Sequence, residues 1–397
     1  MTESSLKVVI AGAGVAALEA VLALRALARD PLSIEVVAPE PEFVYRPLAV
    51  AEPFLAGEAL RFPLARLVEE AGATLRQSRV TRVDLRRREI DVEGGSSVSY
   101  DALLVALGAQ LREAVRGALT FVGPDSSVAL RKVLDQALEG DVRRIAFAVP
   151  AGVAWPLPLY ELALLTRSLL VDHGAIDVDV LLVSPEAGPL ALFGREASDA
   201  LAELLDARGV TCHHSAVPLS FEGGVLRTAP DGAIEADAVV ALPHLVGPRL
   251  AGLPSDAHGF VPIDEHCSVG SGTDVYVAGD ATTFPLKQGG IAAQQADVAA
   301  ASIARLAGSP VELLSFRPVL RGLLLTGMAP RFLRSERGTS RSVVDTEPLW
   351  WPPAKIVGRY LAPFLASKLD LSVKASRPAA GAVPVELELE GGHWTHV

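Results

Sequence analysis

Cysteine is scarce in this chain, whose 397 residues include only Cys212 and Cys267. The two lie far apart and in no CxxC spacing, which excludes a disulfide framework and argues against a thiolate zinc site. Histidine offers no alternative, because His213 and His214 would point to opposite faces of a strand and could not bind one metal together. The sequence therefore predicts no metal centre and a reducing compartment.

Positive charge and long apolar runs are also scarce. Lys and Arg number 36 against 47 Asp and Glu, and the net charge of −11 would repel phosphates, so no nucleic-acid partner is expected. The longest stretch without a charge, residues 145–160, contains three prolines and is too short to span a bilayer. The N-terminal residues lack the pattern of a secretory signal, so we expect a cytoplasmic protein.

Apolar residues are plentiful, at 50% of the chain, and at roughly 150 residues per domain the length predicts two or three domains. Residues 6–37 read as a strand, a glycine turn, a helix and a second strand, and residues 145–183 repeat this βαβ plan. A strand at 274–279 and an Ala-rich helix at 289–306 then return the chain to the first unit. The pattern predicts an α/β fold with two Rossmann-like domains and a C-terminal element.

The domain boundaries follow from this order of segments. We predict a discontinuous first domain made of residues 1–112 and 250–314, a second domain at 113–249, and a C-terminal element at 315–397. Only the first domain has a regular nucleotide-binding turn, and that turn defines the first candidate site.

This turn is the GxGxxA sequence that runs from Gly12 to Ala17 between the first strand and the first helix. Gly12 permits the tight turn, Gly14 lets the backbone approach a pyrophosphate, and Ala17 permits close packing of helix on strand. An acid that binds a ribose hydroxyl is expected at the end of the second strand, where the first carboxylate is Glu40. Glu40 is equally well explained as a solvated loop residue.

Three further motifs accompany the turn in a fixed order. They are FVYRPL at 43–48, YDALLVALGA at 100–109 and TDVYVAGD at 273–280. With the turn, they resemble the two-dinucleotide-domain, FAD-dependent pyridine nucleotide-disulfide oxidoreductases, and most of all the branch of sulfide:quinone oxidoreductases and type II NADH dehydrogenases. The order of four motifs over most of the chain makes this resemblance specific.

The resemblance implies that the first domain binds FAD, in three layers of two sheets and a helical layer. Asp280 would accept a hydrogen bond from the ribityl side, although it could instead be a loop acid that caps the next helix. The helix that follows would direct N–H groups at the flavin ring. The residues expected to contact FAD are Gly12, Gly14, Ala17, Glu40, Arg46, Pro47, Gly108, Gly279, Asp280, Gly290 and Ala292.

Two side chains are candidates for catalysis beside the flavin. Glu161 lies where the family's motif has a glutamate facing the ring, and could donate or accept a proton there. The alternative is an acid near the start of a helix that is stabilised by the helix dipole. Lys287 could lie at the ring edge or be a solvated lysine.

The chain also departs from the family in two ways. It lacks the paired cysteines that disulfide reduction and cysteine-based sulfide oxidation need, so both reactions are disfavoured. Its second βαβ unit has Trp155, Pro156 and Pro158 in place of a second glycine turn. Prolines lack the N–H groups that would bind a pyrophosphate and the indole would fill its space, so ordinary NAD(P)H binding is in doubt.

The C-terminal element differs in charge from the rest of the chain. Residues 315–374 contain ten basic and four acidic residues, together with Trp350 and Trp351. A helix predicted at 354–369 would collect apolar residues on one face, which favours either peripheral contact with the inner face of a membrane or packing against the protein or a dimer mate. The apolar positions of this face are Ile356, Val357, Leu361, Phe364 and Leu365.

The sequence therefore predicts an FAD-dependent oxidoreductase that transfers two electrons from a small donor to an acceptor such as a quinone, without a redox disulfide. An NAD(P)H dehydrogenase with an unorthodox nucleotide site is the first alternative. A flavin-binding interaction or sensor protein without turnover is the second. By the same resemblance we expect a homodimer whose partners are a small-molecule electron donor and acceptor.

Overall fold

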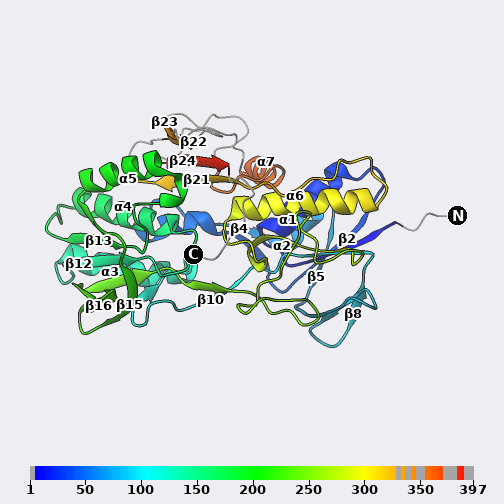
Figure 1. The fold of residues 1–397 in the computed structure, drawn as a ribbon, viewed down its shortest axis with the longest axis horizontal. Coiled ribbons are helices and arrows are strands. Elements are labelled where there is room, and N and C mark those ends of the chain that lie inside the picture. Colours follow the sequence, from blue (N-terminus) through cyan, green and yellow to red (C-terminus); the bar gives the residue numbers. More distant parts are fainter. Residues whose placement is uncertain (1–4, 328–331, 336–341, 346–353, 370–381, 389–397) are drawn as a thin grey trace.

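The computed structural model describes residues 5–327, 332–335, 342–345, 354–369 and 382–388, with the backbone alone for the second, third and fifth of these ranges. Figure 1 shows two α/β parts side by side, one around helices α1 and α6 and the other around α4 and α5. Trp350 and Trp351 lie outside the described residues. The domain boundaries given above stay predictions.

The first part is built on a five-stranded parallel sheet with the strand order β20-β9-β1-β2-β5. Its strands are β20 (Val275–Val277), β9 (Ala102–Val105), β1 (Lys7–Ala11), β2 (Ser33–Ala38) and β5 (Thr74–Gln77). The apolar runs of the sequence become these central strands because both faces of the sheet are covered. The late strand β20 pairs with β9, so the chain does return to the first unit as expected.

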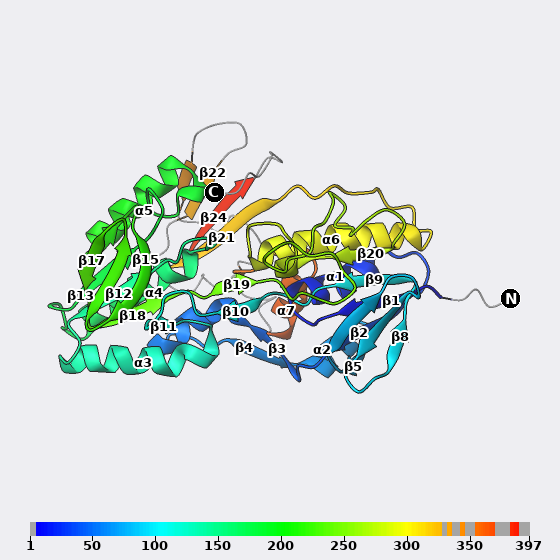
Figure 2. The ribbon, with the colours of Figure 1, turned by 60° about the horizontal axis from the view of Figure 1, so that its bottom comes forward.

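Helices cover one face of this sheet and a small antiparallel sheet covers the other, which gives the expected three layers. The helices are α1 (Val15–Leu27), α6 (Gly289–Leu306) and α2 (Leu64–Glu70); the small sheet is β6 (Val80–Asp84), β7 (Glu89–Val92) and β8 (Ser97–Ser99). Alanines along α1 and α6 are buried together, and these small side chains let the two helices pack closely. Figure 2 shows α1 and α6 running over the sheet.

The second part repeats the plan, with a parallel sheet in the order β11-β18-β12-β13-β14. Its strands are β11 (Leu119–Thr120), β18 (Ala238–Ala241), β12 (Arg144–Ala148), β13 (Asp179–Val183) and β14 (Val210–His213). On one face lie α3 (Pro124–Glu139), α4 (Leu157–Asp172) and α5 (Arg195–Ala207); on the other lie β15 (Val217–Glu222), β16 (Val225–Ala229) and β17 (Gly232–Glu235). The predicted α/β fold with two Rossmann-like sheets is therefore confirmed.

The chain passes between the two parts in two places, and these crossings pair with each other. Outgoing β10 (Gln110–Arg112) and returning β19 (His244–Val246) form a two-stranded antiparallel sheet. Nearby, β3 (Glu42–Tyr45) and β4 (Leu60–Pro63) flank the 3-10 helix η1 (Arg46–Phe54), which contacts α3 and α4 of the second part. The two parts are thus held together at the paired crossings and also by the contacts of η1.

The C-terminal residues add a four-stranded sheet and one more helix. The strands are β21 (Val319–Leu325), β24 (Ala382–Glu388), β22 (Phe332–Ser335) and β23 (Ser342–Asp345), in that spatial order, and the helix is α7 (Leu361–Lys368). Strand β21 packs against α4, whereas α7 packs against α1. The C-terminal residues therefore contact both parts of the molecule.

The predicted helix at 354–369 is wrong in its first half, because residues 354–360 are not helical. The hydroxyl of Tyr45 accepts the N–H of Ile356 at 2.8 Å, and Gly358 lowers the helix propensity of this stretch. The side chain of Tyr45 thus accepts a backbone N–H that would bond to a carbonyl oxygen of the same helix if this stretch were helical.

The apolar face on which membrane contact was predicted is part of the protein's own core. Ile356, Leu361 and Leu365 are at most 5% exposed and pack with residues of α1 and the first sheet. Packing against the protein, the alternative left open by the sequence, therefore accounts for the pattern. No helix among the described residues is long and apolar enough to cross a membrane.

Candidate active site

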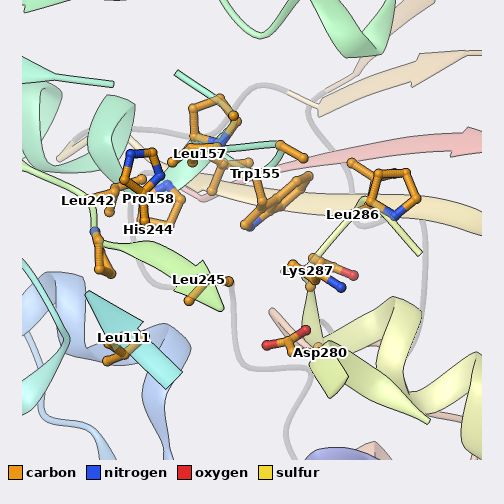
Figure 3. Close-up of a pocket in the computed structure, with 18 of the residues that line it drawn as sticks. Leu111, Trp155, Leu157, Pro158, Leu242, His244, Leu245, Asp280, Leu286 and Lys287 are labelled. Carbon is orange, nitrogen blue, oxygen red and sulfur yellow. The ribbon is translucent and has the colours of Figure 1, made fainter. Parts of the chain in front are cut away.

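A cavity of about 1260 Å³ lies between the two parts of the molecule. Residues of η1, the segment before α4, the turn before α6, strand β21 and the segment before α7 all line it. Figure 3 shows Asp280 and Lys287 close together at one side, with Trp155, Leu157 and leucines of the crossing strands farther away. The cavity thus has a charged side and an apolar side.

The first glycine turn lies at the carboxyl end of β1 and leads directly into α1. Gly12 has a φ of +110°, and a Cβ there would collide with the carbonyl oxygen of Ala106, so only glycine fits. Gly14 is the exposed N-cap of α1, has an ordinary φ of −80°, and has nothing within 4 Å of the position that a Cβ would take. Ala17 is fully buried in the packing of the helix on the sheet. The turn is therefore open where a ligand would approach α1.

Asp280 lies in the short 3-10 turn η3 (Gly279–Ala281) after β20, and Gln295 of α6 fixes this turn. The N–H of Gly279 donates to Oε1 of Gln295 at 2.7 Å, and Nε2 of the same glutamine donates to Thr282 at 3.4 Å. A Cβ on Gly279 would lie 3.4 Å from that of Ala16 and 3.3 Å from that of Ala292. The turn therefore sits between the N-terminal ends of α1 and α6.

The carboxylate of Asp280 lines the cavity and receives no hydrogen bond from any residue that the structure describes. Burial raises its pKa, while the charges of Lys287 and Arg46 act in the opposite direction. A partly buried acceptor to which no described residue donates fits a ligand hydroxyl at this position.

Lys287 is also at the cavity, and its surroundings are partly apolar. Its Nζ donates to the carbonyl oxygen of Thr282 and lies 3.9 Å from the ring centre of Phe260. Burial lowers its pKa to about 8, against the opposing charges of Asp280 and Asp256. Lys287 is therefore held by a fixed set of contacts and titrates near neutral pH.

Helix α6 begins at the edge of the cavity, and the side chain of its N-cap residue accepts a backbone N–H of the first turn. The side chain of Gln288 accepts the N–H of Ile291 at 2.9 Å and donates to the carbonyl oxygen of Arg321 on β21 at 2.9 Å. Gly290 and Ala292 are buried in the first turn of the helix. The helix end is thus tied to the C-terminal sheet.

Glu161 and Lys355 form a buried ion pair in the cavity wall. Nζ of Lys355 donates to Oε2 of Glu161 at 2.6 Å and to the carbonyl oxygen of Pro47 at 3.0 Å. The N–H of Leu325 donates to the other carboxylate oxygen of Glu161 at 2.7 Å. The side chains of Glu161 and Lys355 are 0% and 6% exposed. This pair joins α4, η1, β21 and the segment before α7.

The ion pair also holds a proton near the cavity. Burial raises the pKa of Glu161 and lowers that of Lys355, so the two pKa values approach each other. Glu161 is therefore stabilised by a lysine rather than by the helix dipole alone, and its role as a proton donor or acceptor stays a prediction. Arg46, by contrast, lines the cavity but is exposed, and Pro47 is half-buried.

The second strand-to-helix crossing is closed by side chains. Residues 149–156 connect β12 to α4, and the N-cap of α4 is Pro156. The ring of Trp155 contacts that of Phe193 edge-on, with centroids 5.7 Å apart. A Cβ on Gly322 of β21 would lie 3.0 Å from the indole, so the C-terminal sheet packs directly on this crossing.

The two cysteines lie in different parts of the molecule, and neither lines the cavity. Cys212 is on β14 of the second sheet, and burial raises its pKa to about 11. Cys267 is fully buried in the first part, where burial again raises its pKa. Neither is positioned or ionised as a nucleophile at this site.

Eight of the predicted site residues do not line the cavity, and Glu40 and Gly108 are two of them. Glu40 is exposed beyond the end of β2. Gly108 follows β9 with a φ of +69° and open space around its Cβ position. Both lie at carboxyl ends of strands of the first sheet, the edge at which Gly12 also lies.

The described residues fit an FAD molecule that runs from the first glycine turn to the cavity. The open N-terminus of α1 offers N–H groups for a pyrophosphate, and the carboxylate of Asp280, to which no described residue donates, offers an acceptor for a hydroxyl. These two positions are adjacent across Gly279. The cavity beyond Asp280 then has room for a ring system and a second small molecule.

Several residues of the site escaped the sequence analysis. Gln295, Gln288 and Tyr45 hold the elements around the cavity, and Lys355 provides the partner of Glu161. Each acts across a long sequence separation, so no local pattern marks it.

Comparison with known proteins places the chain among flavin-type reductases. A family model described as pyridine nucleotide-disulphide oxidoreductase matches residues 6–152. The ferredoxin–NAD(+) reductase component of the biphenyl dioxygenase system of Paraburkholderia xenovorans is 30% identical over 297 residues, which cover 71% of this chain and 69% of that protein.

Solved structures share the fold at lower identity. The sulfide:quinone oxidoreductase of Aquifex aeolicus superposes with a TM-score of 0.71 at 18% identity, covering 81% of each chain. A ferredoxin reductase of Rhodopseudomonas palustris gives a TM-score of 0.61 at 20% identity, covering 83% of this chain and 85% of that one.

Proposed function

Because the chain belongs to the pyridine nucleotide-disulphide oxidoreductase family and its cofactor is FAD, we propose that it passes two electrons from a small donor to an acceptor such as a quinone. No redox disulfide takes part. FAD, when bound, supplies the two-electron chemistry, and the protein positions and tunes it. The residues discussed below do the positioning.

The closed second crossing is the observation that carries this proposal. An NAD(P)H-binding unit needs free N–H groups and space at the start of its first helix. Here Pro156 caps α4 and Trp155 packs against Phe193 and β21. The same cavity has an apolar side that suits a hydrophobic acceptor better than a charged dinucleotide.

The proposed FAD site occupies the first part of the molecule. The N–H groups at the start of α1 and the open side of Gly14 would hold the pyrophosphate. Asp280 would accept a hydroxyl of the ribityl chain, and the start of α6 with Gly290 and Ala292 would lie toward the ring. Arg46 and Pro47 are proposed to contact the ring from the side of η1.

Charged groups at the cavity would deliver protons and stabilise negative charge during turnover. Glu161 and Lys355 share a proton that can be delivered to an acceptor in the cavity, and we assign the catalytic role to Glu161. Lys287, with its pKa of about 8, would stabilise negative charge that develops nearby.

The reaction would proceed without thiols. Cys212 and Cys267 have raised pKa values and lie in different parts of the molecule, so neither supports attack on sulfur. This distinguishes the proposed activity from cysteine-based sulfide oxidation.

A second candidate function is NAD(P)H oxidation. The 30% identical relative is a ferredoxin–NAD(+) reductase component, which favours this alternative. It requires that a dinucleotide bind in the cavity without a regular glycine turn.

Anaerobic reduction of the FAD-loaded protein separates these functions. We expect slow bleaching by NADH and NADPH, well below an ordinary catalytic rate of about 10 per second, and rapid reoxidation of the reduced protein by a soluble quinone. Bleaching by NADH at that rate would select the second candidate. Resistance to every donor tried, including sulfide, would indicate a flavin-binding protein without turnover.

The cellular context stays a prediction from the sequence. The proposal includes a homodimer in the cytoplasm, and size-exclusion chromatography with light scattering would test the oligomeric state.

A further inference from the structure

The segment before α7 runs from the cavity to the helical layer of the first part. At one end Lys355 pairs with Glu161, and the N–H of Ile356 donates to the hydroxyl of Tyr45. At the other end the segment enters α7 at Leu361, which is 1% exposed. Whatever fixes the start of α7 therefore also fixes the cavity wall at Lys355.

Glu19 of α1 fixes the start of α7. Its side chain is fully buried, and its two carboxylate oxygens accept the N–H groups of Tyr360 and Leu361 at 2.8 and 2.7 Å. These are N–H groups that a helix leaves unsatisfied at its start. A Cβ on Gly358 would collide with the same carboxylate, so the segment passes as close to Glu19 as a backbone can.

A second buried carboxyl faces Glu19 from α6. Asp297 lies within hydrogen-bonding reach of Glu19, and its Oδ1 is buried without a donor among the described residues. The other charged or titratable groups that face the two are Arg359, which is exposed, and Tyr360. Because the two carboxyl groups lie within hydrogen-bonding reach of each other and away from water, ionisation of both would cost considerable free energy.

We propose that Glu19 and Asp297 share one proton and that this pair positions residues 354–361, and through them Lys355, at the cavity. Asp297 is protonated and donates a hydrogen bond to Glu19. Glu19 stays ionised and accepts the N–H groups at the start of α7. The proposal concerns the docking of this segment and does not depend on which donor or acceptor the protein uses.

The pair makes docking of the segment depend on pH. Burial and the neighbouring Glu19 raise the pKa of Asp297 to about 8, whereas an aspartate that is open to solvent once the segment has undocked has the ordinary value near 4. Docking therefore takes up one proton between about pH 4 and pH 8. The docking constant falls about tenfold per pH unit in that window and is level above pH 8.

Amide hydrogen exchange tests this on the full-length, FAD-loaded protein. Protection of the Tyr360 and Leu361 amides is measured from pH 6 to pH 9.5, with each rate divided by that of an unprotected amide at the same pH. We expect protection to fall about 50-fold from pH 6 to pH 8 and only about twofold above pH 8. Protection that is level from pH 6 to pH 8 overturns the proposal.

Asp297→Asn is the decisive variant, because its amide donates to Glu19 at every pH. We expect its protection to be level across the whole range. Glu70→Gln is the matched control: it removes the exposed carboxylate that binds Lys368 of α7 and should leave the pH dependence unchanged. A pH dependence that persists in Asp297→Asn overturns the proposal.

A spectroscopic measurement on the unaltered protein keeps the proposal testable should Asp297→Asn fail to fold. Carbon NMR of labelled aspartate side chains should show one carboxyl that titrates near pH 8. If every aspartate titrates below pH 6, the shared proton does not exist and the proposal fails.

Discussion

The two strand-to-helix crossings of this molecule occupy equivalent places in two similar sheets and differ in what they leave open. In the first, residues 12–14 join β1 to α1, and the helix N-cap faces open space at Gly14. In the second, residues 149–156 join β12 to α4, Pro156 caps the helix, and Trp155 fills the space in front of it.

The difference teaches that a duplicated architecture need not keep a duplicated site. The first crossing is held by close packing of small residues and stays free to bind. The second is held by the C-terminal residues, through the contact of β21 with Trp155 and the ion pair of Glu161 with Lys355. The same position in the fold is therefore open in one part and closed by packing in the other.

The largest effect is expected when a carboxylate is placed at the open crossing. Gly14→Glu should abolish FAD binding, because its side chain projects a negative charge toward the pyrophosphate site. The φ of −80° at Gly14 suits any residue, so the fold should be kept. Absorbance of the purified protein and release of FAD on denaturation measure the loss.

The matched control places the same side chain at the closed crossing. Ala151 is exposed in the loop before α4, and Ala151→Glu should leave the FAD content unchanged. Equal FAD content in both variants would mean that FAD is not bound at the first crossing.

The second test removes the ion pair that holds the closed crossing. Lys355→Met leaves Glu161 buried without its counter-charge and should lower the free energy of unfolding by about 3 to 5 kcal/mol. Denaturant unfolding at pH 7 measures the change. The double variant Glu161→Gln with Lys355→Met should recover most of it, since no buried charge remains; if the double variant is as unstable as Lys355→Met, the stabilisation comes from packing alone.

The third test concerns the charge beside the open crossing. Lys287 is protonated below its pKa of about 8, so the rate of FAD reduction should fall about tenfold as pH rises through 8. In Lys287→Met the rate should be low and level, and in Lys287→Arg it should be high and level because arginine stays charged. Stopped-flow absorbance between pH 6.5 and 9.5 measures these profiles, and a step that persists in Lys287→Met assigns the titration to another group.

The smallest effect is expected from the two cysteines, one in each part. Replacement of both Cys212 and Cys267 by alanine should leave the rate of flavin reduction unchanged, although the cavity left in the core at Cys267 costs some stability. Loss of reduction with fold and FAD content preserved would restore a thiol mechanism and remove the contrast with thiol-dependent relatives.

The sequence predicted the strands and helices of the two βαβ units well, because apolar runs and the turns that flank them are local features of a sequence. The bounds of α6 agree with the predicted helix at 289–306, since the helix propensity of an Ala-rich run depends on its own residues. The first glycine turn was also predictable, because only glycine can adopt the φ at Gly12.

The cavity wall could not be predicted in the same way. Glu161 and Lys355 are 194 positions apart, and nothing near either residue marks the other. The helix predicted at 354–369 failed for the same reason, because the start of α7 is fixed by Glu19 of α1 rather than by its own neighbours. Contacts between distant segments decide these features.

The separation of Glu161 from Lys355 also has a consequence for the synthesis of the protein. At about 5 to 20 residues per second, a ribosome that has made Glu161 needs about 10 to 40 s to add Lys355. During that time α4 exists without the cation that allows its glutamate to be buried, so the nascent second part cannot close over the cavity. A chain released early would keep this region accessible to proteases, and stalled nascent chains that end before residue 354 should be cleaved near α4 whereas full-length chains resist.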